Sequence, residues 1–171
     1  SNTPEINITR EEFYNFQKNF FIKKRDLDLI KLFVQKNPEF LLKDDLINFY
    51  ANHFLAKANI KQSCEIFDSI DEGTFVNDYT SKLKIYCLVN SNKIDQALLI
   101  YDLKKETGFK DDFFEKKLFT LIGFEDESNE ISDKNLLEFH LSHRVVENFE
   151  YIPSDKTSKE VWKYLASANL L

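Results

Sequence analysis

The chain has 171 residues, of which 43% are hydrophobic and 30% are charged, so it can bury a core of ordinary size and is not disordered. Only three glycines and three prolines are present, which argues against sandwiches, barrels and Rossmann folds, because those folds need such residues in tight turns and phosphate loops. The net charge is −6 and arginine is rare, which argues against a nucleic-acid partner.

Apolar periodicity and end signals predict a succession of helices joined by short turns. Thr9 with Glu12 is a capping-box pattern for the first helix, and Asp26 can cap the second, which ends before Pro38. Later helices are expected to begin at Asp44, at Ile60, after Gly73–Thr74, after Asn90–Asn92 and at Asp111. Gly108 and Gly123 stop the last two of these.

The rest of the chain departs from this regular spacing. Residues 124–132 are acidic and aperiodic, which predicts a surface loop. Residues 133–171 are expected to form a C-terminal helical cap of two helices, over 133–148 and 157–170, in which Trp162 and Tyr164 pack. The sequence begins Ser1–Asn2 and contains no methionine, so we expect residues 1–8 to be disordered or vector-derived and the chain to be an excised piece of a longer protein.

An internal repeat is the most informative feature of residues 9–123. Ile94 follows Ile60 by 34 positions, and at this offset Ile, Gln, Ile and Asp recur in place over residues 60–68 and 94–102. Phe67 then aligns with Tyr101. In the preceding helices, Phe20, Phe54, Leu88 and Ile122 form one column, and Phe16, Tyr50, Lys84 and Leu118 another. We therefore predict three to four helical hairpins, with Phe20, Phe33, Phe54, Phe67 and Tyr101 in the core.

A period of 34 with two helices in each unit resembles the tetratricopeptide repeat. Ala97 with Tyr101 and Ser63 with Phe67 match the small residue and the aromatic residue of that family's second helix. The family's glycine is replaced and its closing proline is missing, so the repeats are degenerate. The resemblance implies an all-α fold, a right-handed superhelix of antiparallel helix pairs, with the C-terminal segment as its cap.

The resemblance also implies a concave groove lined by the first helix of each pair, which receives a peptide or a helix. Asparagine can pair with an extended backbone, lysine with carboxylates, and tyrosine offers contact area with a polar tip. An ordinary solvated face is the alternative. Mapping the repeat places these side chains on the groove: Tyr14, Lys18, Asn48, Asn52, Tyr79, Lys82, Tyr86, Lys116 and Thr120.

Histidines and cysteines give two further candidates. His140, His143 and Glu147 share one helical face, so they are weak candidates for metal ligands that would need a further ligand from elsewhere. The spacing matches neither the His-Glu-x-x-His motif nor the Glu-x-x-His motif of helical-bundle metal sites, and a buried, hydrogen-bonded histidine beside a surface one is the alternative. Cys64 and Cys87 are either two small buried residues or a disulfide between packed helices.

No catalytic arrangement is found, so we expect a bacterial protein–protein interaction or scaffold module that is not an enzyme, has no cofactor and binds a protein or peptide partner. One alternative is an accessory superhelical domain of a larger enzyme, such as a cell-wall lytic enzyme. Another is a helical metalloprotein using His140, His143 and Glu147. No membrane span is predicted, because no apolar stretch approaches about twenty residues. We expect a soluble protein, cytoplasmic or periplasmic, and the sequence leaves its partner and oligomeric state open.

Overall fold

The structure is a computed structural model that describes residues 8–71, 75–126 and 128–171. Every regular element in these ranges is helical, which confirms the all-α fold class. The predictions for residues 1–7 and for Gly73–Thr74 lie outside the described residues. The elements are α1 (Arg10–Lys24), α2 (Leu27–Lys36), α3 (Lys43–Leu55), α4 (Ile60–Cys64), the 3-10 helix η1 (Glu65–Phe67), α5 (Asp78–Asn90), α6 (Ile94–Glu106), α7 (Asp112–Leu121), α8 (Leu136–Val145) and α9 (Lys159–Ser167).

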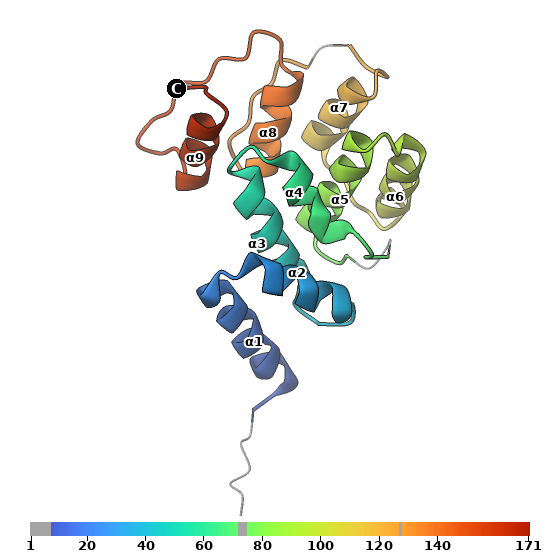
Figure 1. Cartoon of the computed structure of the whole chain (residues 1–171). Coiled ribbons are helices and arrows are strands. Elements are labelled where there is room, and N and C mark those ends of the chain that lie inside the picture. The colour runs from blue at the N-terminus through green and yellow to red at the C-terminus, as the bar shows by residue number, and fades with distance from the viewer. Residues whose placement is uncertain (1–7, 72–74, 127) are drawn as a thin grey trace, which may run out of the picture.

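The helices up to α7 follow one another as hairpins, with α1 at one end of the molecule and α6 and α7 far from it (Figure 1). The second helix α4 packs on its own first helix α3 and on α5, and α2 packs on α3 of the next unit. Phe33 of α2 also stacks on Phe21 of α1, and Tyr101 of α6 donates a hydrogen bond to Glu115 of α7. Stability in such an arrangement is a sum over units and their junctions. The chain is therefore built of helical-hairpin repeats.

The second helices use a small residue where two helices approach closely. Ala97 is fully buried, and the hydroxyl of Ser63 donates a 2.7 Å hydrogen bond to the carbonyl oxygen of Ala51. Phe67 and Tyr101, one turn later in their helices, are buried as predicted. The aligned small and aromatic positions therefore have the same structural role in both units.

The predicted helix ends are largely confirmed. Side-chain oxygens of Thr9, Asp26 and Asp111 accept hydrogen bonds from the backbone of their first turns. Gly108 has a φ of 93°, in the left-handed region that favours glycine after a helix. The fourth helix is shorter than predicted, because α4 tightens into η1 and ends at Phe67 instead of continuing to Ile70.

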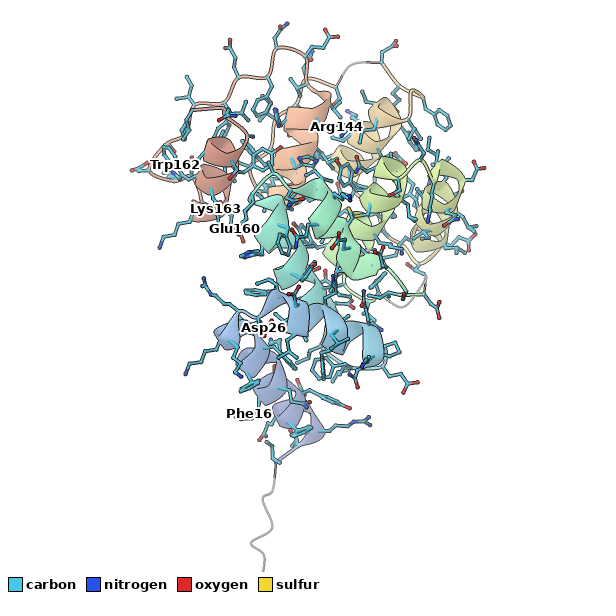
Figure 2. All side chains as sticks on the ribbon, viewed as in Figure 1. Phe16, Asp26, Arg144, Glu160, Trp162 and Lys163 are labelled. Atoms are coloured by element: carbon cyan, nitrogen blue, oxygen red, sulfur yellow. A yellow bond between two sulfur atoms is a disulfide. The ribbon has the colours of Figure 1, made fainter. Side chains whose placement is uncertain are left out.

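Two predictions about aromatic burial are wrong. Phe20 is 47% exposed, because no second helix in the described residues covers this side of α1. Trp162 is 41% exposed, whereas Tyr164, on the other side of α9, is buried. Figure 2 shows Phe16 and Trp162 at the periphery of the molecule.

The two C-terminal helices are shorter than predicted, and α8 begins three residues later than the expected start at Asp133. The Asp133 carboxylate instead accepts a 2.6 Å hydrogen bond from the hydroxyl of Tyr151, and Asn135 caps α8. The helix α8 packs against α7 and also reaches back to α3, and α9 packs on α8. The C-terminal segment therefore folds back over the first helices of the stack.

The acidic segment between α7 and α8 is held by a buried lysine. Lys117 is fully buried, and its ammonium group donates hydrogen bonds to the carbonyl oxygens of Ser128 and Glu130 and to the Ser128 hydroxyl. Burial lowers the pKa of Lys117, and the nearby Glu130 carboxylate opposes that shift. These contacts fix the path along which the chain turns from α7 toward α8.

A disulfide joins Cys64 on α4 to Cys87 on α5, with 5.5 Å between their Cα atoms. It links the second helix of one hairpin to the first helix of the next. The two cysteines are the only ones in the chain. Of the two alternatives left open by the sequence, the structure has the covalent one.

We expect Cys64→Ser to lower the free energy of unfolding by about 3 kcal/mol, because a bridge across 23 residues restricts the unfolded chain. Urea unfolding with and without dithiothreitol measures the difference. The reductant should destabilise the wild type by a similar amount and leave the variant unchanged. A wild type that is equally stable in both conditions would contradict the bridge.

Candidate binding surface on the first helices

The side chains predicted to line a groove form a ladder of polar contacts between successive first helices. Lys18 of α1 pairs with Asp45 of α3 at 3.3 Å, and Lys82 of α5 pairs with Asp111, the cap of α7, at 2.7 Å. Burial of Asp111 acts in the opposite direction, but hydrogen bonds from Lys82 and the Phe114 amide hold the pKa of Asp111 below its usual value. These two lysines are thus already paired with carboxylates of the same chain.

Asparagines form the middle of this ladder, between α3 and α5. The Tyr79 hydroxyl donates a 2.6 Å hydrogen bond to Oδ1 of Asn52. The Thr80 hydroxyl donates to Oδ1 of Asn48 at 2.7 Å, and the Asn48 amide reaches Asn77. Both asparagines therefore join neighbouring units, and the hydroxyl group of Tyr79 is held between helices.

The upper part of the predicted groove is covered by α8. Tyr86 of α5 is 3% exposed, and its hydroxyl lies 2.6 Å from Nε2 of His140 on α8. Arg144, near the end of α8, donates to the side-chain oxygen of Asn90 at the end of α5. Because α8 also contacts α3 and α7, it lies across three first helices. In the folded chain this part of the groove contains a helix of the protein itself.

The remaining predicted groove residues lie at the two ends of the ladder. Tyr14 is partly exposed and stacks edge-to-face on Phe40, with Arg10 bonded to its hydroxyl. Lys116 is exposed on α7. The Thr120 hydroxyl donates to the carbonyl oxygen of Lys116 in its own helix.

A chain of hydrogen bonds connects α5, α8 and α9 through two histidines. Nδ1 of His140 lies 2.8 Å from the Tyr164 hydroxyl, and Nδ1 of His143 lies 2.7 Å from the same oxygen. One assignment satisfies all groups: Tyr86 donates to His140, His140 donates to Tyr164, and Tyr164 donates to His143. Burial, with Arg144 and His143 nearby, lowers the pKa of His140 to about 3. This series of hydrogen bonds therefore requires a neutral His140.

The metal alternative receives no support from this geometry. Both ring nitrogens of His140 bond tyrosine hydroxyls, and Glu147 is exposed beyond the end of α8. In the part of the chain that the structure describes, no three His, Cys, Asp or Glu side chains are grouped so that they could hold a metal ion. The expectation that the chain is not itself an enzyme stays a prediction.

Near His53 of α3, cationic side chains of α9 and of the residue that follows α1 come close to the helix. His53 is partly buried and stacks edge-to-face on Phe54. Burial lowers the pKa of His53, and positive charges on Lys57, Lys163 and Arg25 lower it further. Figure 2 shows Lys163 on α9 near α3, and Asp26 where α2 begins. These four residues, Arg25, His53, Lys57 and Lys163, are called the basic cluster below.

Sequence reasoning missed the basic cluster because its members come from three separate segments. His53 is the only histidine on its helix, and Lys163 lies in the C-terminal segment, whose position cannot be read from the repeat. The one available signal was a pair of cations near the ends of consecutive first helices, Arg25 and Lys57, since the repeat places such ends side by side.

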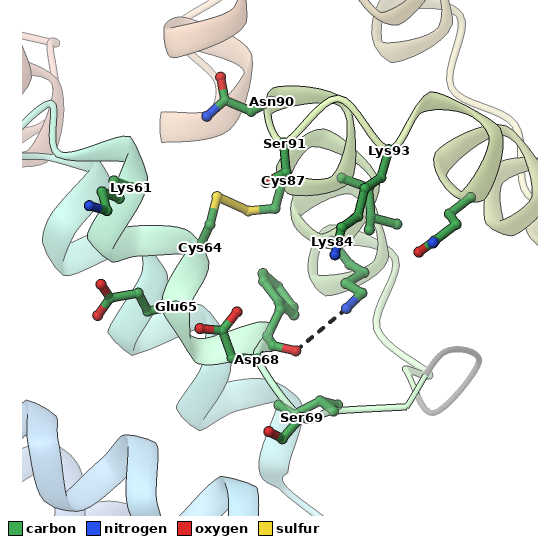
Figure 3. Close-up of a pocket in the computed structure, with 14 residues that line it drawn as sticks. Lys61, Cys64, Glu65, Asp68, Ser69, Lys84, Cys87, Asn90, Ser91 and Lys93 are labelled. Atoms are coloured by element: carbon green, nitrogen blue, oxygen red, sulfur yellow. Dashed lines mark hydrogen bonds between the residues drawn. A yellow bond between two sulfur atoms is a disulfide. The ribbon is translucent and has the colours of Figure 1, made fainter.

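A hollow lies beside the disulfide, with a volume of about 730 Å³ (Figure 3). Its lining alternates in charge, with Lys61 and Lys93 near Glu65 and Asp68. Lys84 is buried at its wall and donates a 3.5 Å hydrogen bond to the carbonyl oxygen of Phe67. Because charges of both signs line this cleft, it favours no particular class of ligand, and the basic cluster is the better candidate site.

Comparison with known proteins supports the repeat architecture. A chloroplastic pentatricopeptide repeat-containing protein of Arabidopsis thaliana is 31% identical to the chain over 98 residues, which is 56% of this chain and 14% of that protein. The chain thus spans about a seventh of this relative. No protein-family model and no solved structure matches the chain. Together with the all-helical structure, the similarity fits a helical-repeat solenoid; the tetratricopeptide type and a bacterial origin stay predictions.

None of the helices in the described ranges has the length and apolar character needed to cross a membrane.

The buried histidine predicts how stability depends on pH. Below pH 6.5 the unfolded chain protonates His140 while the folded chain keeps it neutral down to about pH 3. The free energy of unfolding should therefore fall as the pH drops through this window, by roughly 1.4 kcal/mol per pH unit from this group. Urea unfolding between pH 7 and pH 5 measures the slope.

The glutamine side chain in His140→Gln does not titrate. The free energy of unfolding of this variant should therefore depend on pH less steeply than that of the wild type, by about the amount given above. His53→Gln is the matched control and should flatten the slope less, because that ring is partly exposed. Identical slopes for the wild type and His140→Gln would contradict a neutral, buried His140.

Proposed function

We propose that the chain is a helical-repeat interaction module that binds an acidic segment of a protein partner at the basic cluster. The observation that carries this proposal is that α8 covers only part of the surface formed by the first helices α1, α3, α5 and α7. The helix α8 covers the part of this face around Tyr86. Around His53, in contrast, Arg25, Lys57 and Lys163 are exposed, with the carboxylates of Asp26 and Glu160 at the edge of the cluster (Figure 2). A peptide or helix from a partner therefore has its best access there.

The chemistry of the basic cluster favours carboxylates. Arg25, Lys57 and Lys163 are exposed and able to reorient toward a ligand, whereas Lys18 and Lys82 are held by aspartates. A neutral His53 adds a ring nitrogen that can donate a hydrogen bond, and an anion beside it would favour its protonated form. Binding of an acidic segment should therefore strengthen as the pH falls through the pKa of His53.

Single-stranded RNA is the second candidate, and the pentatricopeptide-repeat relative is the observation that favours it. Repeats of that kind read RNA with two or three side chains for each base. The net charge of −6 and the pairing of Lys18 and Lys82 with carboxylates argue against a basic track along the first helices. We therefore favour a protein partner and treat RNA as the competing outcome.

The test is fluorescence anisotropy with two labelled probes, a glutamate-rich decapeptide and a single-stranded RNA of mixed sequence. We expect saturable peptide binding in moderate salt, weakened roughly three- to tenfold by Lys163→Glu, because reversing an exposed charge changes a contact by about 1 kcal/mol. Binding should weaken further with added salt, since the cluster is solvent-accessible.

Lys110→Glu is the matched control, because Lys110 is an exposed lysine on the distant α6–α7 turn, and it should leave binding unchanged. Peptide binding that is equally weakened by both variants would show non-specific attraction and reject the proposed site. RNA binding that is tighter than peptide binding and lost in Lys163→Glu would assign the cluster to nucleic acid instead.

A further inference from the structure

The exposed face of α1 is a row of three phenylalanines. Phe13, Phe16 and Phe20 are 47%, 67% and 47% exposed, and α1 contains no buried residue. Their spacing puts all three on one side of the helix, opposite the side that packs on α3. We call these three residues the α1 stripe. Contiguous apolar patches of this kind mark interaction sites.

The repeat shows that this face is suited to receiving a helix. At an offset of 34 residues, the α1 stripe corresponds to Ile47, Tyr50 and Phe54 of α3, which are 0%, 0% and 9% exposed. The preceding second helix, α2, packs on α3. In the described part of the chain no second helix lies on the corresponding side of α1, so the α1 stripe is exposed.

Charges at the two ends of α1 identify the occupant. Its first turn contains Glu11 and Glu12, and its last turn contains Lys23 and Lys24. Glu12 and Lys23 lie on the same flank of the α1 stripe, because eleven residues at 100° each bring the helix nearly back to the same direction. A second α1 in the antiparallel direction would place Glu12 of each copy opposite Lys23 of the other. A parallel pair about a two-fold axis would put these flanks on opposite sides of the interface and form no Glu12–Lys23 pair.

We propose that two copies of this chain associate through the α1 stripe, with the two α1 helices antiparallel about a two-fold axis. Such an interface is self-complementary, with the phenylalanines in the centre and two Glu12–Lys23 pairs at the rim. The exposed parts of the three rings amount to roughly 300 Å² per copy, or about 600 Å² in total, which is below the size of a standard specific interface. The dimer is therefore weak and transient.

Sedimentation equilibrium over roughly 1 to 200 µM protein tests the dimer. The wild type should pass from monomer to dimer in this range, and Phe16→Glu should stay monomeric with an unchanged melting temperature. Ile152→Glu alters another exposed apolar residue, outside α1, and should leave the dimer intact. A wild type that is monomeric at the highest concentration, or a dimer that persists in Phe16→Glu, would overturn the proposal.

Charge exchange tests the antiparallel direction. Glu12→Lys and Lys23→Glu should each raise the dissociation constant several-fold, and combining both changes in one chain should restore it. Failure of the double variant to recover would reject the antiparallel pairing. Because the α1 stripe and the basic cluster are separate, Phe16→Glu should bind the acidic peptide as the wild type does. A wild type that forms the dimer but does not bind the acidic peptide would reject the proposed function and leave the dimer in place.

Discussion

A two-helix hairpin has more apolar surface than its two helices can cover for each other, and this constraint organises the whole molecule. In α3, one side packs on its own partner α4, and another is buried only because α2 of the preceding unit lies on it. Each fully buried aromatic side chain contributes roughly 1.5–3 kcal/mol, so a unit without neighbours loses much of its stabilisation. The order of the units therefore determines which faces are buried.

The same constraint explains both unusual regions of the fold. Within the described residues, no second helix lies on the outer side of α1, and Phe13, Phe16 and Phe20 are exposed. At the other end, α8 folds back over α3, α5 and α7, where a binding groove was expected. The first-helix face is thus used largely for internal contacts, and the region beside His53 is where we propose that a partner binds.

Polar groups determine how the C-terminal segment is attached. The hydrogen-bonded chain from Tyr86 through His140 and Tyr164 to His143 ties three helices together and requires neutral histidines. Lys117 holds the connecting segment by its carbonyl oxygens. Buried polar groups must be satisfied, so these contacts restrict α8 to one orientation more strictly than apolar packing would.

Local signals in the sequence predicted the hairpins well. Caps at Asp26 and Asp111 and the buried Phe67 and Tyr101 follow from patterns within a few residues or from the repeat. The position of α8 was not predictable, because it depends on contacts such as Tyr86 with His140, 54 residues apart. The same holds for the disulfide and for the basic cluster, whose members are brought together only by the fold. Phe20 was misjudged because a repeat column does not reveal which unit lies at the end.

The central claim is that α8 is buried against the first helices and is not a detachable appendage. Hydrogen exchange of the backbone amides, followed by mass spectrometry, tests it most directly. We expect the amides of α8 to be protected as strongly as those of α3 and α5, and far more than those of the exposed segment around Ile152. Exchange of α8 as fast as that segment would mean that the groove is open in solution, and the account given for the binding surface would be wrong.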